Sequence, residues 1–577
     1  MTTWVRWACA TAVMVAALSG GPALAQESSS HPNYLPQSLQ ADDVPIDSVI
    51  VRLSKSSGDS GQDEVALAAA RKFAAFLTGR GFNPIEVSKV VARITREAAV
   101  ARVTYRLLPD GPNGIRVLFL VDAAAKPRGE GAPEGILTGE LRDFPVLYKD
   151  GRSLLTAIVA GGLGGYSDSN PWFGQPELFN KSSPIAGHLP GREASWTEGS
   201  LEYGGGFAAQ LDDLPIYAFG ALTGMTTWSI GQDIYRDDTR VFDAIEKAYA
   251  GFLYANTETR NRFKFSVGRQ TYTLNDSFLV NLVKGSTNVG PRGATYLGPR
   301  LANDFSVLAD GRVGPWSAAV FYINPDELEY LETDSTYLGA NLGYAFNDRV
   351  SLDGTFITLP TSKSTYANPY GLTLDRQGLN TLSAHLKWRD LPVEGVFAEG
   401  ELAHQSHPDY AMSAWAGYGT LGYIARKAPW TPSISYRYAV FSGDDPDTRT
   451  YERFDSLLST GLGIWLQGIS FGKLFANSNL ATQRVQLNVV PLEALNVTFD
   501  YHKLTAPELN NLGSNPALSE LMSHDIGQEF TLSGRWALNR NLYLQGIASY
   551  ALPGEALRDI GADKPWTTLQ LSLYWSL

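Results

Sequence analysis

The sequence predicts an all-β transmembrane barrel of about 18 antiparallel strands, preceded by a small α+β domain. Three observations lead to this fold class: a secretory leader, a run of short segments of alternating polarity from about residue 145, and a last segment, residues 567–577, that alternates up to its end. In that segment Leu569 and Leu571 fall on one face, and Gln570 and Ser572 on the other. The alternative fold class is a soluble sandwich or propeller. In such a protein an open apolar edge strand would promote aggregation, whereas in a barrel the last strand pairs with the first.

Residues 1–25 have the features of a secretory signal peptide. Arg6 precedes an apolar run through Leu18, and Ala23-Leu24-Ala25 forms a small-x-small cleavage site. The single cysteine, Cys9, lies inside this leader, so a mature chain would lack disulfides, thiol catalysis and cysteine metal sites. Losing Arg6 changes the formal charge from −12 to −13, which excludes a non-specific nucleic-acid binder. After the leader, no apolar run reaches the roughly 20 residues of a membrane helix, so a membrane span would have to be a barrel.

The remaining chain divides into two domains and two linkers. We expect a polar linker at 26–43, an α+β domain at 44–123, a Pro/Gly-rich linker at 124–143 and the barrel at 144–577. The α+β pattern is a strand at 46–53, a helix, a second helix from about 83 to 98, and strands near 103–107 and 115–121. In the first helix the residues at core spacing are Val65, Ala69, Phe73, Phe76 and Leu77.

The order β-α-α-β-β over about 80 residues resembles a POTRA module, the periplasmic unit of outer-membrane assembly and two-partner secretion barrels. An unrelated small α+β domain is the alternative. The resemblance implies that this domain docks a periplasmic partner, for example by adding a strand to its exposed sheet edge.

Segments of the predicted barrel alternate strictly, with charged residues in mid-strand on one face only. Leu382, Leu386 and Trp388 oppose His385 and Lys387, for example. Aromatic residues at strand ends are expected to form the two interfacial girdles, namely Trp430, Trp536, Trp566, Tyr344 and Phe346. The last strand also resembles the signal by which the outer-membrane assembly machinery recognises barrels, with Leu577 in place of the usual terminal aromatic residue.

Three stretches resemble the alginate export family of outer-membrane proteins. They are SVGRQTYTLNDSF at 266–278 followed by YLGPRLANDFSV, YRYAVFSGDDPDTRTYERFDSLL at 436–458, and DIGQEFTLSGRWALNRNLYLQGIASYALPGEAL at 525–557. The resemblance covers the barrel only. It implies about 18 strands in a Gram-negative outer membrane, with the N-terminal domain in the periplasm, and passive export of an exopolysaccharide or diffusion of small solutes. The family's periplasmic export partner is usually a separate protein, so the additional domain departs from the pattern.

Charges on the predicted lumenal face bear on the solute. A polyuronate needs inward basic groups to replace its counterions. Strand parity places seven basic residues inside as candidate pore-lining groups: Arg262, Lys264, Lys387, Arg389, Arg437, Arg484 and Arg535. The acidic residues on the same face are Asp353, Glu399, Glu401, Asp500 and Glu529. The small basic excess favours an anionic, alginate-like solute, although each basic residue could instead pair with an acid on a neighbouring strand.

Three other features leave alternatives open. Strict alternation would point Arg269 at lipid, unless Gly268 marks a bulge or Arg269 lies beyond the hydrocarbon edge. The stretch from Ser167 to Ser195 could fold into the pore or cover one mouth. The acidic stretch 442–455 could bind Ca²⁺, but a loop held by pairs of Asp with Arg449 or Arg453 is favoured.

The sequence predicts no enzyme, no cofactor and no metal site. The histidines after the leader and linker lie near no nucleophile elbow and no metal-spacing motif; they are His188, His385, His404, His407, His502 and His524. The alternatives to polysaccharide export are therefore a sugar-selective or general porin, and a two-partner secretion or assembly barrel that passes protein. The stretch 290–300, GPRGATYLGPR, lacks the Arg-Gly-Tyr arrangement typical of the second class. The expected partners are the lipid bilayer, a polysaccharide or small solute, the assembly machinery and a periplasmic export protein, without nucleic acid.

Overall fold

The computed structural model describes residues 46–577 apart from 79–81, 83–86, 88–89, 92, 96–99, 101, 110–114, 124–132, 140, 182, 184–185, 213, 257–258, 260, 283–292, 294–295, 298–300, 328–331, 348, 391, 460–464, 493 and 540. The predicted signal peptide and the first linker lie outside the described residues. The predicted start of the second helix at 83–86 and half of the second linker, residues 124–132 and 140, also lie outside them.

The N-terminal domain is a three-stranded sheet with a helix. Its elements are β1 (Ile46–Lys55), α2 (Ser60–Ala74), the 3₁₀ turn η2 (Ala75–Leu77), β2 (Arg102–Pro109) and β3 (Ile115–Asp122). The strand order is β1-β3-β2, with β1 parallel and β2 antiparallel to β3. Asp59 caps α2 by accepting from the backbone N–H of Gly61 and Gln62, which satisfies two otherwise unpaired donors. These strands and this helix follow the predicted pattern.

The core-facing side of α2 differs from the prediction. The structure buries Ala66, Ala70 and Ala74 against the sheet, whereas Val65 is 68% exposed. Alanines allow the helix backbone to approach the sheet closely, so Val65 and Phe76 are exposed, whereas Phe73 still packs against the core in part, as predicted. Leu77 is buried as predicted, because the chain tightens into η2 at that point.

The rest of the described chain forms a closed barrel of 18 antiparallel strands. Each strand pairs with the next in sequence, as short connections favour. The strands are β5 (Ser153–Ser169), β6 (Glu193–Gln210), β7 (Ile216–Gln232), β8 (Arg240–Ala255), β9 (Arg262–Arg269), β10 (Phe305–Val313), β11 (Trp316–Asn324), β12 (Thr336–Asn347), β13 (Val350–Thr361), β16 (Asn380–Arg389), β17 (Val396–Ser406), β18 (Ala414–Ile424), β19 (Ser433–Phe441), β20 (Leu480–Leu492), β21 (Leu495–Thr505), β22 (Asp525–Asn539), β23 (Leu542–Pro553) and β24 (Trp566–Ser576).

The last strand closes the ring, as the alternating C-terminal segment predicts. Thr567 of β24 lies opposite Ser169 of β5, and Ser576 lies opposite Ala160. The short strand β4 (Val146–Lys149) pairs with the first residues of β5, beyond the point where β24 ends. The first barrel strand is therefore paired along most of its length, which leaves little open edge.

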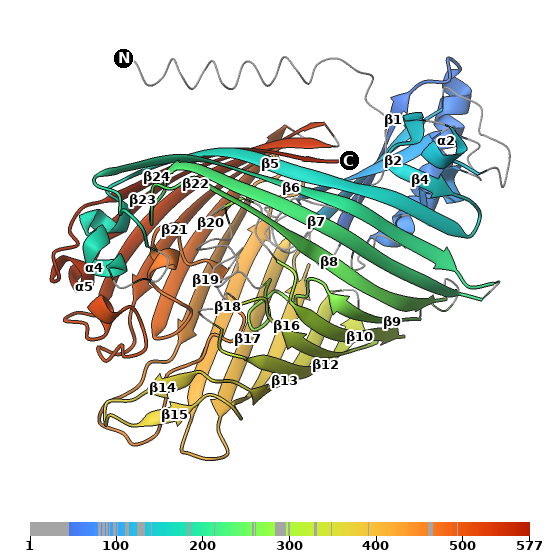
Figure 1. Cartoon of the computed structure of the whole chain (residues 1–577). Helices are drawn as coiled ribbons and strands as arrows, with labels where there is room; N and C mark the ends of the chain where they lie inside the picture. Colours follow the sequence, from blue (N-terminus) through green and yellow to red (C-terminus); the bar gives the residue numbers. More distant parts are fainter. Residues whose placement is uncertain are drawn as a thin grey trace, which may run out of the picture.

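The two ends of the barrel differ. At one end the connections are short, such as the turn 314–315; at the other end they are long and include 170–192, 270–304, 362–379 and 442–479. The long connections carry the helices α4 (Pro176–Asn180) and α5 (Glu555–Arg558) and the hairpin of β14 (Thr365–Ala367) with β15 (Thr373–Asp375). Figure 1 shows these elements at the end opposite to β1, β2 and α2. Outer-membrane barrels have short periplasmic turns and long extracellular loops, so the N-terminal domain lies at the end with periplasmic character.

The outer surface of the barrel is apolar and bears aromatic side chains near the strand ends. Trp430, Trp536 and Phe346 are exposed there, and Tyr344 packs on the exposed Trp316 with ring centroids 4.7 Å apart. These positions fit the predicted girdles. Trp566 does not: it is fully buried and lies inside the barrel, because its parity matches that of the lumenal residues of β24.

No helix in the described part of the chain is both long and apolar enough to cross a membrane.

A charged residue on the outer face of β24 should destabilise the folded barrel. Leu571 is 53% exposed at mid-strand, so Leu571→Arg places a cation in hydrocarbon and should cost about 2–4 kcal/mol. The measurement is the free energy of unfolding from bilayers in a denaturant titration. Gln570→Arg, on the lumenal face next to it, is the control and should change the free energy much less; equal losses would contradict the assigned faces.

Candidate functional site in the barrel lumen

The connection 270–304 crosses the inside of the barrel. Near its start, Phe278 packs on Tyr418 of β18 with ring centroids 5.1 Å apart. Further along, the backbone N–H groups of Tyr296 and Leu297 both donate to Glu198 of β6 at 2.7 Å. The strand order puts β6 opposite β17 and β18, since β7 to β16 lie between them on one side and β19 to β5 on the other. This connection therefore spans the lumen and narrows it.

The connection 442–479 also folds inward. Glu529 of β22 accepts from the backbone N–H groups of Ile469, Ser470 and Phe471 at 2.5, 3.1 and 3.3 Å. Backbone N–H groups that are removed from water need hydrogen-bond acceptors. Here the single carboxylate of Glu529 accepts from all three N–H groups. Gly468 precedes them with φ +84°, and a Cβ there would lie 2.5 Å from Glu529, so the close approach requires glycine.

The two inward connections meet over an aromatic cluster. Trp465 donates through Nε1 to the carbonyl of Asp276 at 2.9 Å and lies 4.8 Å from Phe278 between ring centroids. The predicted pore-directed stretch 167–195 adds to the interior, because Phe173 packs on Phe471 at 5.0 Å. Trp566 packs against the same group at 5.6 Å from Phe173. Side chains from four parts of the chain thus pack together inside the barrel near the long-loop end.

The charged lumenal wall is divided into an acidic part and a basic part. Asp353, Glu399 and Glu401 lie on β13 and β17, around His385 of β16. Arg437 of β19 lies directly opposite Arg484 of β20 in the strand register. Thr420 of β18 separates Glu399 from Arg437 in the same row of paired residues. At this level the wall therefore carries carboxylates on one side of Thr420 and guanidinium groups on the other.

Of the predicted pore-lining residues, the structure brings Arg437 and Arg484 together. Arg484 Nε is bound to Asp500 Oδ1 at 2.7 Å. Arg437 donates to Gln467 at 3.3 Å, and its guanidinium carbon lies 4.4 Å from the centroid of the Trp465 ring. Lys387 lies in the neighbouring acidic part, 3.3 Å from Glu399.

The other predicted residues lie near the short-turn end of the barrel. Arg262 begins β9 and lies 3.9 Å from Asp310 of β10, and Lys264 lies opposite Asp310 in register. Arg535 lies over the ring of Tyr543 at 4.5 Å. Arg389 ends β16 and forms an ion pair with Asp47 of β1, so it joins the barrel to the N-terminal domain. These four residues do not form one site with Arg437 and Arg484.

Arg269 does not face lipid. It ends β9 and is bound to Asp304 at 2.9 Å and to Asp326 at 2.8 Å, with most of the side chain buried. Gly268 before it has φ +123°, and the pairing of β9 stays in register with both neighbours. The alternation therefore ends at a glycine in a left-handed conformation, without a bulge.

Sequence reasoning missed the lumenal residues that come from connections. Trp465 and Gln467 lie outside any strand, so no period of two marks them. Lys473 Nζ lies over the rings of Trp566 and Tyr296, at 4.8 and 5.2 Å from their centroids. Burial lowers the pKa of Lys473. The one sequence signal for a packed segment here is the aromatic content of the stretch 436–458 and its neighbours.

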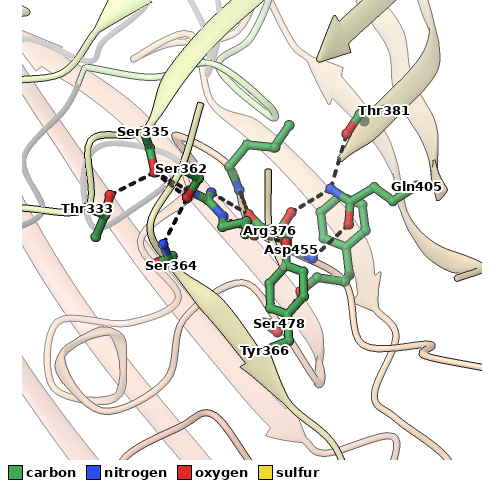
Figure 2. A network of polar contacts seen from close by, with 12 residues as sticks. Thr333, Ser335, Ser362, Ser364, Tyr366, Arg376, Thr381, Gln405, Asp455 and Ser478 are labelled. Carbon is green, nitrogen blue, oxygen red and sulfur yellow. Dashed lines mark hydrogen bonds and ion pairs between the residues drawn. The ribbon is translucent and has the colours of Figure 1, made fainter. Parts of the chain in front are cut away.

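A polar network joins several of the long connections (Figure 2). Arg376, which follows β15, binds Asp455 with two parallel contacts of 2.6 and 2.9 Å, and Tyr366 donates to Asp455 at 2.6 Å. Gln405 of β17 accepts from the backbone N–H of Asp455 at 2.7 Å. Burial opposes ionisation of Asp455, but Arg376 outweighs it and holds the pKa of this carboxyl below its ordinary value. The network fastens the β14–β15 hairpin to the inward connection 442–479.

The acidic stretch 442–455 is held by its own backbone. Asp444 accepts from the N–H of Glu452 at 2.9 Å, and Asp445 from the N–H of Asp447 at 2.9 Å. Arg453 donates to Asn511 at 2.8 Å, where the sequence favoured a pairing with an aspartate.

Comparisons with known proteins found one family model and several solved structures that match this chain. The crystal structure of Pseudomonas aeruginosa OpdQ matches with a TM-score of 0.45 and 10% identity, over 73% of this chain and 97% of that chain. The structure of P. aeruginosa OccK11 (OpdR) matches with a TM-score of 0.41 and 11% identity, over 73% and 96%. Among curated protein sequences, none matches. The family model described as alginate export matches residues 232–564, more than half of the 577 residues.

Proposed function

The chain belongs to the alginate export family and forms an outer-membrane channel, and we propose that this channel passively exports an anionic exopolysaccharide. The observation that carries the proposal is the pair Arg437 and Arg484, which lie opposite each other on adjacent strands at the level where the inward connections narrow the lumen. Two guanidinium groups at one level lower the electrostatic barrier for a carboxylate and recognise it by paired hydrogen bonds.

The groups around this arginine pair favour weak binding, which a transported solute requires. Asp500 is bound to Arg484, so this guanidinium is partly neutralised and would hold a uronate weakly. Trp465 is buried and lies under Arg437, so it holds this guanidinium in place beside Arg484. Conduction requires sites that attract a solute without retaining it. Passive export needs no catalytic group, so the proposal includes no enzymatic activity.

The N-terminal domain is proposed to dock a periplasmic partner. In the described residues β1 and β2 each pair only with β3, so both lie at edges of the sheet, where a partner strand can add. The ion pair of Asp47 with Arg389 supports a position of this domain beside the short-turn mouth, next to the route of the solute.

Removing the basic pair should weaken anion selectivity. We expect the double variant Arg437→Ala, Arg484→Ala to shift the reversal potential under a salt gradient toward cations, because Asp500 and the acidic part of the wall would then dominate the field. Block by anionic oligouronates should weaken at least about tenfold, as loss of two charge-assisted contacts predicts. The measurement is single-channel recording in planar bilayers with the full chain.

Lys427→Ala is the matched control, because it removes one positive charge from an exposed turn outside the lumen. It should leave the reversal potential and the block unchanged. Cation selectivity of the unmodified channel, without oligouronate block, would contradict the proposal and favour a porin for neutral sugars or a barrel that passes protein.

A further inference from the structure

Three potential metal ligands from separate parts of the chain meet in the acidic part of the lumenal wall. They are Asp276 from the connection that crosses the lumen, His385 of β16 and Glu399 of β17. One ligand atom of each lies within 4.8 Å of those of the other two, and all three residues are buried. His385 Nε2 lies 3.1 Å from Glu399 Oε1. An imidazole nitrogen and two carboxylates within this distance can bind one ion after small side-chain movements.

Two further buried polar atoms belong to the same cluster. His385 Nδ1 has no hydrogen-bond partner within the described residues, and Asp353 Oδ2 lies 3.6 Å from it. The hydroxyl of Tyr418 is also buried without a hydrogen bond of ordinary geometry, although it lies beside Asp276. Buried polar atoms are normally satisfied, so this pair of unsatisfied atoms indicates that the cluster accommodates a ligand.

The charges in the cluster also favour a cation. Four carboxylates, those of Asp276, Asp353, Glu399 and Glu401, lie in this part of the wall, and the basic groups that act on them are His385, Lys387, Arg389 and Arg437. Lys387 Nζ is 3.3 Å from Glu399 and neutralises part of this charge. A metal ligand needs a neutral imidazole, and a cation held between Asp276 and Glu399 would pair directly with both buried carboxylates.

We propose that Asp276, His385 and Glu399 bind a divalent first-row transition metal of the Zn²⁺ type. The imidazole selects against Ca²⁺ and Mg²⁺, which prefer oxygen ligands throughout. Three protein ligands leave an open position for water or for a carboxylate of the solute. Since Asp276 belongs to the crossing connection and the other two ligands to the wall, the metal ties this connection to the barrel at its narrow level.

The test uses the full chain, treated with a chelator and titrated with Zn²⁺, and with Co²⁺ as a probe whose visible absorption reports its coordination. Asp276→Asn and His385→Gln should each weaken Zn²⁺ binding at least about tenfold, because loss of second-shell partners alone costs about 10–100-fold. Heat-dependent electrophoretic mobility of each variant verifies that the barrel has folded. Asp276 lies in a connection, so its variant tests the site even where the strand variant fails to fold.

His502→Gln is the matched control. His502 is buried in the lumenal wall, and neither ring nitrogen has a hydrogen-bond partner, but it lies on β21, outside the cluster. It should retain the affinity of the unmodified chain and the same Co²⁺ spectrum. Equal Zn²⁺ binding by all four proteins, an equal loss in the His502 variant, or tighter binding of Ca²⁺ than of Zn²⁺ would each overturn the proposal.

Discussion

Replacing Asp455 with Ala should release the β14–β15 hairpin from the long-loop end, with a local cost of about 3–5 kcal/mol. The substitution removes one partner of a buried ion pair and leaves the Arg376 guanidinium without its two carboxylate contacts. It also removes the acceptor of the Tyr366 hydroxyl. Hydrogen exchange of residues 362–379 measures the local free energy directly, since the hairpin opens without unfolding of the barrel.

The same contact predicts a pH dependence. The folded pKa of Asp455 lies below its unfolded value of about 3.9, so its contribution to stability is complete above that value and is lost as pH falls through the lower folded pKa. The hairpin should therefore open in strongly acidic solution, and the Ala variant should lack this transition. Lys363→Gln is the control, because it breaks the exposed pair with Asp334 in the same region and should change exchange little. Protection that is the same in the Asp455 variant and the unmodified chain would refute the proposed role of the pair.

Replacing Glu198 with Ala should loosen the connection that crosses the lumen. Glu198 is fully buried and accepts from the backbone N–H groups of Tyr296 and Leu297 and from Trp196 Nε1 at 2.6 Å. Each buried donor left without a partner costs about 1–3 kcal/mol, so three such donors predict a loss of several kcal/mol at this anchor. We expect a higher single-channel conductance with larger current fluctuations in planar bilayers.

Glu198→Gln should be milder, because its side-chain oxygen still accepts a hydrogen bond. Glu193→Ala is the control on the same strand: Glu193 is exposed at the start of β6 and accepts only from the hydroxyl of Ser169 among its hydrogen bonds in the described structure. A conductance trace of the Glu198 variant that matches that of the Glu193 variant would show that the crossing connection does not restrict the current.

The strands and their faces could be predicted from the sequence because they depend on a local rule. Side chains alternate across a strand, so Leu569 and Leu571 predict the outer face of β24 and, with it, the closure of the barrel. The same rule, applied consistently, would have placed Trp566 inside with Thr568. The rule fails at Gly268, because a positive φ reverses the direction of the side chain that follows.

The narrow part of the lumen could not be predicted in the same way. Its residues come from two strands and a connection, as with Asp276, His385 and Glu399, or from connections alone, as with Trp465. No periodic pattern relates them, and their meeting depends on how backbone N–H groups of the connections find carboxylates such as Glu198 on the wall. The sequence predicts that ion pairs can form between neighbouring strands, but not which residues form them. Arg484 and Asp500 lie on adjacent strands, and the sequence does not reveal the register of these strands.

The pairing of residue 169 with residue 567 also affects how fast the barrel can form. Nearly every other strand contact joins neighbours in sequence, so most of the sheet can grow by local hairpin steps. The closing contact instead requires a chain-spanning loop, whose entropy cost precedes any gain from the final ladder of hydrogen bonds. Folding should therefore be limited by this last step, with a long-lived open sheet as the species that precedes the native barrel.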